Sequence, residues 1–227
     1  QAIIDQFFVI SGFKRDLVGK KVLVTAGGTR EAIDPVRFIG NRSSGKQGIA
    51  VAKAAAARGA TVHLIAANVD MAECDGVVTT HVESAQQMLS ELEKSFSDSD
   101  ILVMSAAVAD AKPKNSSVQK IDKSDFTSIE LQVNPDLLAT LSAKKANQVM
   151  VGFAAQTSEL IASAQSKLIS KGLDLIYVND VTGGAIFGQD ETEGTIVLRN
   201  GDLIPIARQS KDTLAHHLLD YALEQLG

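Results

Sequence analysis

The sequence predicts an α/β domain with a mostly parallel β-sheet, helices on both faces of the sheet and a C-terminal β-hairpin extension. Short apolar, β-branched runs alternate with helix-forming segments, which is the order of a parallel sheet with crossover helices. The first apolar run ends in a glycine-bearing turn, and an Asn-Gly pair typical of hairpin turns lies near the end of the chain. With 227 residues, 45% of them hydrophobic, the chain can bury one large core.

The first half of the chain is predicted to contain three strands separated by two helices. "KVLVTAGGT" (Lys21–Thr29) is a buried strand followed by a tight turn, and Ser44–Gly59 is an alanine-rich helix that stops at a glycine. A second strand covers Thr61–Asn68, and a helix with apolar residues at helical spacing covers Glu83–Phe96. Asp100–Asp110 is a third apolar strand that runs into a loop of small residues. This β-α-β-α-β order indicates right-handed crossovers.

The second half continues the alternation and then changes. A helix with proline at its first position, Pro135–Ala143, precedes a strand over residues 148–157, a helix over 158–172 and a strand over 173–180. Thr195–Ala207 is predicted to form a hairpin that turns at Asn200-Gly201, and a last helix covers residues 210–226. The whole pattern predicts a Rossmann-like sheet.

The composition excludes several classes of protein. A net charge of −5 argues against binding of nucleic acid through a broad basic face. Cys74 is the single cysteine, so an internal disulfide and a multi-cysteine metal site are excluded. No apolar run is long enough to span a bilayer and no signal peptide is visible, which predicts a cytoplasmic protein without membrane contact. Because the chain begins with Gln1, we expect residues 1–18 to be a linker from an upstream domain and residues 19–227 to form one domain.

The stretch "GNRSSGKQ" (Gly40–Gln47) nearly matches the phosphate-binding loop G-x-x-x-x-G-K-[ST]. In that loop one strand joins one helix directly, whereas here "AGGTREAIDPVRFIG" intervenes between strand and lysine. Gln47 also lacks the hydroxyl that would hold Mg²⁺. The stretch is therefore not a P-loop.

A phosphate site of another kind is still predicted here. Ser43 and Gly45 lie at the start of a helix, where free backbone N–H groups and the helix dipole favour an anion. Gly48 allows a close approach of backbone, and the Gly27-Gly28 turn leaves the first strand toward the same crevice. The cations Arg37, Arg42 and Lys46 lie nearby in the sequence. The alternative is a plain helix start, with Ser44 as N-cap and glycines present for packing.

One polar segment, Ala111–Asp125, fits no regular element. It carries Lys112, Lys114, Lys120 and Lys123 and follows a strand directly. Ligands bind at the carboxyl ends of parallel strands, so a lysine-bearing flap would suit an anionic ligand there. A solvated surface loop is the alternative.

Three other classes of function are possible alternatives. "SSGKQGIA" loosely resembles the glycine turn of NAD(P)-dependent short-chain reductases, but that class needs a lysine four residues after a tyrosine, and Val181 and Gln225 stand at those positions. No G-x-S-x-G hydrolase motif is present, and the adjacent pair His216-His217 lacks the i,i+4 spacing of metal ligands on a helix. A nucleotide-sensing module without catalysis is the third possibility.

Six ordered motifs resemble one enzyme family. They are "VTAGGTREAIDPVRFIGNRSSGKQG", "SAAVAD", "KI" in the lysine-bearing flap, "NPDLL", "VGFAAQT" and "VND". They resemble the 4′-phosphopantothenoyl-L-cysteine synthetases, from about Asp16 to the end of the chain. In most bacteria that enzyme is the C-terminal half of the bifunctional coenzyme A biosynthesis flavoprotein. The resemblance thus implies an upstream flavin-dependent decarboxylase domain.

The resemblance implies a two-step ligation. CTP activates the carboxylate of 4′-phosphopantothenate as an acyl-cytidylate and releases pyrophosphate, and the amine of cysteine then displaces CMP. Mg²⁺ (or Mn²⁺) is the implied cofactor, with ligands that the motifs do not identify. A homodimer is also implied, and Thr195–Ala207 is a candidate edge for pairing.

Roles of individual residues follow from the same resemblance. Asn41 matches the catalytic asparagine that handles the acyl-cytidylate, Arg37 matches an arginine of the same step, and Lys120 matches the flap lysine that forms the intermediate. The matched nucleotide-binding positions are Gly28, Ser43, Gly45, Gly48, Ser105, Ala106, Asp110, Lys120, Pro135, Asp136, Leu137, Leu138, Phe153, Lys167 and Lys171. Two positions depart from the family: Asp122 interrupts a lysine cluster, and Arg42 stands where His or Phe is common.

Overall fold

A computed structural model describes residues 15–70, 72, 74–156, 160–180 and 189–227 of the chain. Its centre is an eight-stranded sheet with the strand order β12-β11-β10-β9-β6-β1-β4-β5. The parallel part of this sheet consists of β1 (Lys21–Gly27), β4 (Thr61–Ala67), β5 (Val77–Val82), β6 (Ile101–Met104), β9 (Val149–Gln156) and β10 (Leu175–Asp180). In chain order these six strands lie 3-2-1-4-5-6, the order of doubly wound dinucleotide-binding folds. The predicted Rossmann-like sheet is confirmed.

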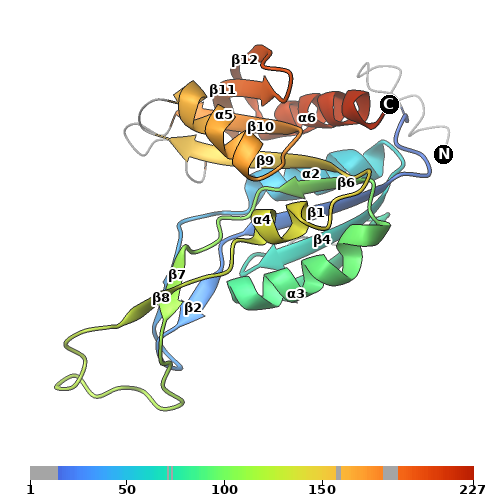
Figure 1. The fold of residues 1–227 in the computed structure, drawn as a ribbon. Helices are drawn as coiled ribbons and strands as arrows, with labels where there is room; N and C mark the ends of the chain where they lie inside the picture. The colour runs from blue at the N-terminus through green and yellow to red at the C-terminus, as the bar shows by residue number, and fades with distance from the viewer. Residues whose placement is uncertain (1–14, 71, 73, 157–159, 181–188) are drawn as a thin grey trace.

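Helices cover both faces of the sheet, as predicted (Figure 1). The helices α2 (Lys46–Ala57) and α6 (Lys211–Leu226) share one apolar core with one face. On the other face lie α3 (Ala85–Ser95), α4 (Leu137–Ser142) and α5 (Leu160–Ser170), with a short 3-10 turn, η1 (Phe96–Asp98), after α3. Strand residues such as Val22 and Leu23 alternate between the two cores, because successive side chains of a strand point to opposite faces.

The C-terminal hairpin is also confirmed. Strand β11 (Glu191–Leu198) pairs antiparallel with β10, and β12 (Leu203–Ser210) forms the edge of the sheet. At the turn, Gly201 has a φ of 96°, and the Asn200 side chain accepts a hydrogen bond from the Asp202 N–H at 3.0 Å. The Asn-Gly pair therefore forms the turn as predicted, because glycine tolerates the left-handed backbone.

An arm that the sequence did not predict projects from the carboxyl edge of the sheet (Figure 1). It consists of two antiparallel ladders, β2 (Arg30–Ala32) with β3 (Phe38–Gly40) and β7 (Ala111–Pro113) with β8 (Leu131–Val133). A hydrogen bond from the Ser117 N–H to the Ile33 carbonyl, 2.9 Å long, joins the two ladders. The predicted flap is therefore the tip of an arm that begins and ends in short strands.

Three further details differ from the sequence prediction. Strand β5 was missed because its residues, "VVTTHV", are polar and partly exposed at the sheet edge. Helix α4 begins after its N-cap, Asp136, so Pro135 precedes the helix instead of occupying its first position. Helix α2 has Gly45 as N-cap, with a φ of 71° and no capping side chain, so Ser44 is not the cap.

A buried arginine ties the first described residues to the domain. The side chain of Arg58 is 1% exposed and forms ion pairs with Asp16 and Asp220, each at 2.8 Å. It also donates to the His216 carbonyl at 3.0 Å. Buried charge is tolerated only when it is paired and hydrogen-bonded, and this guanidinium meets both conditions. Leu17 is fully buried beside it, whereas residues 1–14 of the predicted linker lie outside the described residues.

Candidate active site

The candidate site lies where the strand order reverses. Strand β1 has β4 on one side and β6 on the other, and the bridge between Gly28 and Ala107 extends the β1–β6 pairing beyond both strands. Crossover connections leave to opposite faces at such a point, which opens a crevice at the carboxyl ends of the strands. The predicted Gly28 is therefore in the wall of the expected ligand crevice.

The start of α2 is open to an anion. Its N-cap, Gly45, offers no side chain to the first N–H groups of the helix, and the first turn contains no acidic residue. Gly48 is packed so closely that an added Cβ would lie 2.4 Å from the Ser105 hydroxyl oxygen and 2.6 Å from the Thr25 carbonyl oxygen. Glycine is thus required for the helix to approach the sheet, and the approach brings its positive end to the crevice.

A cavity of about 210 Å³ lies between the first residues of α2 and those of α6. Six of the predicted nucleotide-binding residues line it: Ser43, Gly45, Gly48, Ser105, Ala106 and Phe153. Its charged lining residues are Arg42, Lys46 and Lys211, all cations, and no carboxylate lines the cavity within the described part of the chain. The structure therefore brings the helix-start residues together with Arg42 and Lys46, whereas the predicted Gly28 and Arg37 do not line this cavity.

The cavity is also lined by Tyr177 and Thr192, which none of the motifs contains, next to the predicted Phe153. The ring of Phe153 meets that of Tyr177 edge to face, with centroids 5.8 Å apart. The Tyr177 hydroxyl lies 2.8 Å from the Thr192 hydroxyl. Burial raises the pKa of Tyr177 to about 12, although the hydrogen bond with Thr192 opposes this. The phenol therefore stays protonated and serves as a fixed wall, not as an acid or base near neutral pH.

Asn41 lies at the junction between the arm and the crevice. Its side-chain amide nitrogen donates to the Val108 carbonyl at 2.9 Å. Its backbone carbonyl oxygen would lie 2.8 Å from a Cβ added to Gly28. The second predicted catalytic residue, Lys120, is exposed in the loop of residues 114–130. Asn41 directly follows β3 and Lys120 lies in the outer loop of the arm, and neither of them lines the cavity.

The third predicted catalytic residue, Arg37, binds the backbone of the flap and forms what we call the clasp. Its guanidinium donates to the buried carboxylate of Asp34 and, at 2.7 Å, to the carbonyl of Ile121, the residue after Lys120. It also stacks 3.8 Å above the Phe126 ring. Burial alone would raise the pKa of Asp34, but hydrogen bonds from Arg37 and from the N–H groups of Val36, Arg37 and Ile121 outweigh it and hold that pKa well below its usual range.

The remaining predicted residues lie near the other face of the sheet, at α4 and α5. Asp136 caps α4 by accepting from the Ala139 N–H at 3.0 Å, and Lys171 forms an ion pair with the same carboxylate. Desolvation acts against the charge of Asp136, but the bonds from Lys171 and Ala139 lower its pKa. The Asp110 carbonyl accepts from the Asn134 N–H at 2.9 Å, which joins Asp110 to "NPDLL".

The other members of this second group lie on or next to α4 and α5. Leu137 is buried at the start of α4, whereas Pro135 and Leu138 are partly buried beside it. Lys167 is exposed on α5, one turn before Lys171. These residues do not line the cavity described above. Most of the predicted nucleotide contacts thus fall into two groups, one on each face of the sheet, while Gly28, Asp110 and Lys120 belong to neither group.

No group of three or more His, Cys, Asp or Glu side chains suited to a metal occurs within the described ranges. A protein-only metal centre therefore does not fit the described residues. Mg²⁺ in nucleotide sites is commonly held by one or two carboxylates together with substrate phosphates and water. The exposed carboxylate of Asp110, which follows β6 at the carboxyl edge of the sheet, is compatible with that kind of binding. Among the described helices, none is both long and apolar enough to cross a bilayer.

The fold and the cavity define a doubly wound α/β domain with a crevice at its switch point whose described charged lining residues are cations. Residues 17–226 match the family described as "DNA/pantothenate metabolism flavoprotein C-terminal domain". The chain belongs to this family, which confirms the resemblance predicted from the six motifs.

Curated relatives agree with this assignment. The chain is 44% identical over 218 residues to the coenzyme A biosynthesis bifunctional protein CoaBC of Mycobacterium tuberculosis, covering 90% of this chain and 52% of the relative. For the CoaBC protein of Vibrio cholerae the identity is 43% over 216 residues, covering 92% and 54%. The chain thus spans about half the length of these relatives.

Solved structures agree as well. The crystal structure of the C-terminal domain of CoaBC has a TM-score of 0.80 at 36% identity, covering 92% of this chain and 97% of that one. The DNA/pantothenate metabolism flavoprotein from Streptococcus pneumoniae has a TM-score of 0.78 at 25% identity, covering 90% and 99%. Both matches span nearly the whole of the solved chain, so the described fold is that of the C-terminal domain.

Proposed function

We propose that this domain is a CTP-dependent phosphopantothenate–cysteine ligase of coenzyme A biosynthesis. The observation that carries the proposal is a cavity whose charged lining residues, in the part of the chain that the structure describes, are all cations. Six motif residues line it, and they come from a family whose bifunctional members act in coenzyme A biosynthesis. Both CTP and 4′-phosphopantothenate are polyanions, and such a site binds them through backbone N–H groups and lysines. No nucleophilic side chain is needed.

The proposed reaction has two steps, activation of the acid and amide formation. A carboxylate oxygen of 4′-phosphopantothenate forms a bond to the α-phosphorus of CTP while the bond to the leaving pyrophosphate breaks. The amine of cysteine then attacks the acyl carbon, the bond to CMP breaks, and the amine loses a proton. The N-terminal end of α2 stabilises the charge on the phosphates, because its first N–H groups have no capping side chain.

Asn41, Lys120 and Arg37 act from the arm. We assign Asn41 to the acyl-cytidylate, since a side-chain amide can donate to an acyl oxygen without titrating. Lys120 neutralises phosphate charge when the flap lies over the cavity. The position of Arg37 supports a role in holding that flap, because its guanidinium binds the Ile121 carbonyl at 2.7 Å. Asp110 would hold Mg²⁺, which would supply positive charge to neutralise the phosphates.

We further propose that the domain works as a cytoplasmic homodimer behind a flavin-dependent decarboxylase domain. The sequence pointed to Thr195–Ala207 as the pairing edge, and β12 does form an edge of the sheet. The arm is the better candidate surface. It exposes the apolar side chains of Val36, Phe38, Leu131 and Val133, at 63%, 50%, 50% and 84%, and exposed apolar surface of this kind is typical of interfaces.

An isotope experiment tests the proposed chemistry. The domain is given CTP, cysteine, Mg²⁺ and 4′-phosphopantothenate labelled with ¹⁸O in its carboxylate. An acyl-cytidylate requires one labelled oxygen to appear in CMP, as measured by mass spectrometry. Label in inorganic phosphate would instead indicate an acyl phosphate, and amide formation with unlabelled CMP would exclude the proposed intermediate.

A further inference from the structure

The first residue of α6, Lys211, belongs to the same cavity as the start of α2, although it is far away in the sequence. The Lys211 carbonyl accepts a hydrogen bond from the Gln47 side chain at 3.1 Å, which fixes the two helix starts against each other. Lys211 is partly buried, and its ammonium group donates to the Gln189 carbonyl. Its position is therefore set by the fold rather than by solvent.

The charged groups around Lys211 favour binding of an anion. The nearby carboxylate of Asp190 is bound to Lys46 at 2.6 Å. Burial first, and then the charge of Lys46, lower the pKa of Lys211, while Asp190 acts in the opposite direction. Asp190 is largely exposed and does not line the cavity. The Lys46 ammonium thus binds Asp190, the Lys211 ammonium only feels the charge of that carboxylate, and no described residue that lines the cavity is acidic.

We propose that Lys211 binds a phosphate group of an anionic substrate in this cavity. The inference rests on the proposed function and adds a residue that none of the six motifs contains. An ammonium group offers three donors, and hydrogen bonds between ionised partners are the strong ones. On binding, Lys46 exchanges Asp190 for phosphate, and Lys211 adds a second cation from the opposite wall.

Lys211→Met tests the proposal, with Lys53→Met as the matched control. Lys53 is exposed on α2 and does not line the cavity. Calorimetric titration with tripolyphosphate and, separately, with 4′-phosphopantothenate measures each affinity in the presence of Mg²⁺. Loss of one charge-assisted bond weakens binding about tenfold or more. We expect this for Lys211→Met with one of the two ligands, little change for Lys53→Met and partial recovery for Lys211→Arg.

The two titrations identify the source of the phosphate. Weaker tripolyphosphate binding assigns Lys211 to the nucleotide, and weaker 4′-phosphopantothenate binding assigns it to the acid substrate. Unchanged affinity for both ligands, in a variant that melts like the wild type, overturns the proposal. A wild-type domain that forms no amide product would refute the proposed function alone, because the titrations require no catalysis.

Discussion

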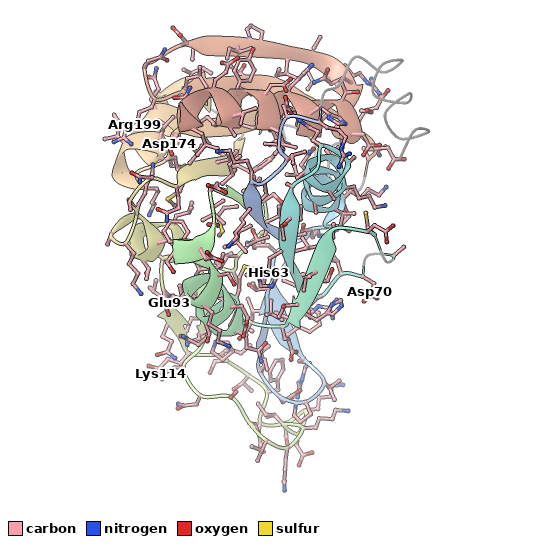
Figure 2. The ribbon with its side chains drawn as sticks, turned by 90° about the vertical axis from the view of Figure 1, so that its right-hand side faces the viewer. His63, Asp70, Glu93, Lys114, Asp174 and Arg199 are labelled. Atoms are coloured by element: carbon pink, nitrogen blue, oxygen red, sulfur yellow. The ribbon has the colours of Figure 1, made fainter. Side chains whose placement is uncertain are left out.

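At the cavity, Ala154 and Thr192 are 4% and 5% exposed, whereas Val118 and Val133 on the arm are 92% and 84% exposed. The cavity wall borders the two apolar cores that lie on the two faces of the eight-stranded sheet. The arm is tied together by short ladders and by the Asp34–Arg37 clasp. Figure 2 shows Lys114 on the arm, far from Asp174 and Arg199 on the body of the domain.

This difference separates two tasks. The proposed phosphate cradle is preorganised by burial, so its N–H groups would need no rearrangement when charge develops. Elements with few buried apolar contacts open locally at low cost in free energy, so we expect the arm that carries Lys120 to move more easily than the cavity wall. Four substitution experiments test this division, from the largest expected effect to the smallest.

The largest effect is expected at Lys120 and Asn41, the two proposed catalytic residues of the arm. Lys120→Gln removes the charge that stabilises the phosphates during activation, so pyrophosphate release should fall by about a hundredfold or more. Asn41→Asp should still release pyrophosphate but stall at the acyl-cytidylate. Coupled assays of pyrophosphate and of amide product distinguish the two blocks. Normal amide formation in either variant would contradict its assigned role.

A change in the cavity wall should instead reduce stability. In Gly48→Ala the new methyl group would clash with the Ser105 hydroxyl and the Thr25 carbonyl. Such overpacking costs about 1–3 kcal/mol of unfolding free energy, measurable by urea denaturation, and it displaces the helix start from the crevice. Lys53→Ala on the same helix is the control and should change stability by less than about 0.5 kcal/mol. A Gly48→Ala domain as stable as the wild type would show that the wall is not tightly packed.

Breaking the clasp should loosen the arm and leave the sheet unchanged. Arg37→Ala removes the guanidinium from Asp34 and from the Ile121 carbonyl. We expect faster amide hydrogen exchange at Ile121, by about tenfold or more, because a buried carboxylate loses its partner. Arg37→Lys keeps the charge but loses the two-pronged donor, so its effect should be intermediate. Unchanged exchange at Ile121 would rule the clasp out.

The clasp also has a predictable pH dependence. Since folding lowers the pKa of Asp34, the stabilisation is present above the unfolded carboxyl pKa, about 3.9, and is lost only as the pH falls through the lower folded value. Exchange at Ile121, corrected for its intrinsic rate, should therefore be flat from neutral pH down to about 5.

The smallest effect is expected on the surface of the arm. Lys114 pairs with Glu130 at 2.8 Å, with side chains 54% and 68% exposed. Exposed pairs contribute about 0–1 kcal/mol. Glu130→Gln should thus leave the urea midpoint nearly unchanged, and a loss above about 1 kcal/mol would mean that the arm depends on surface charge.

Much of the fold could be predicted because local signals and tertiary structure agree. Apolar runs marked the central strands, Gly59 ended α2, and Asn200-Gly201 placed the hairpin turn. Strand β5 escaped because an exposed edge strand carries polar residues that resemble a loop. The short strands of the arm were also missed, because strands of three residues are too short to show a period of two in the sequence.

The candidate site divides in a similar way. Ser43, Gly45 and Gly48 could be found because helix-start chemistry is local in sequence. Lys211 and Tyr177 could not, because only the strand order brings them to the α2 cavity. The Arg37 clasp was missed because its partner carbonyl, at Ile121, lies in a loop whose path the sequence does not specify.

Pyrophosphate release tests the central claim most directly. It would be measured with CTP and separately with ATP, in the presence of Mg²⁺ and 4′-phosphopantothenate, before and after cysteine is added. The proposed ligase releases pyrophosphate from CTP without cysteine, and forms CMP and amide only once cysteine is present. Absence of release with either nucleotide from a folded domain would contradict it.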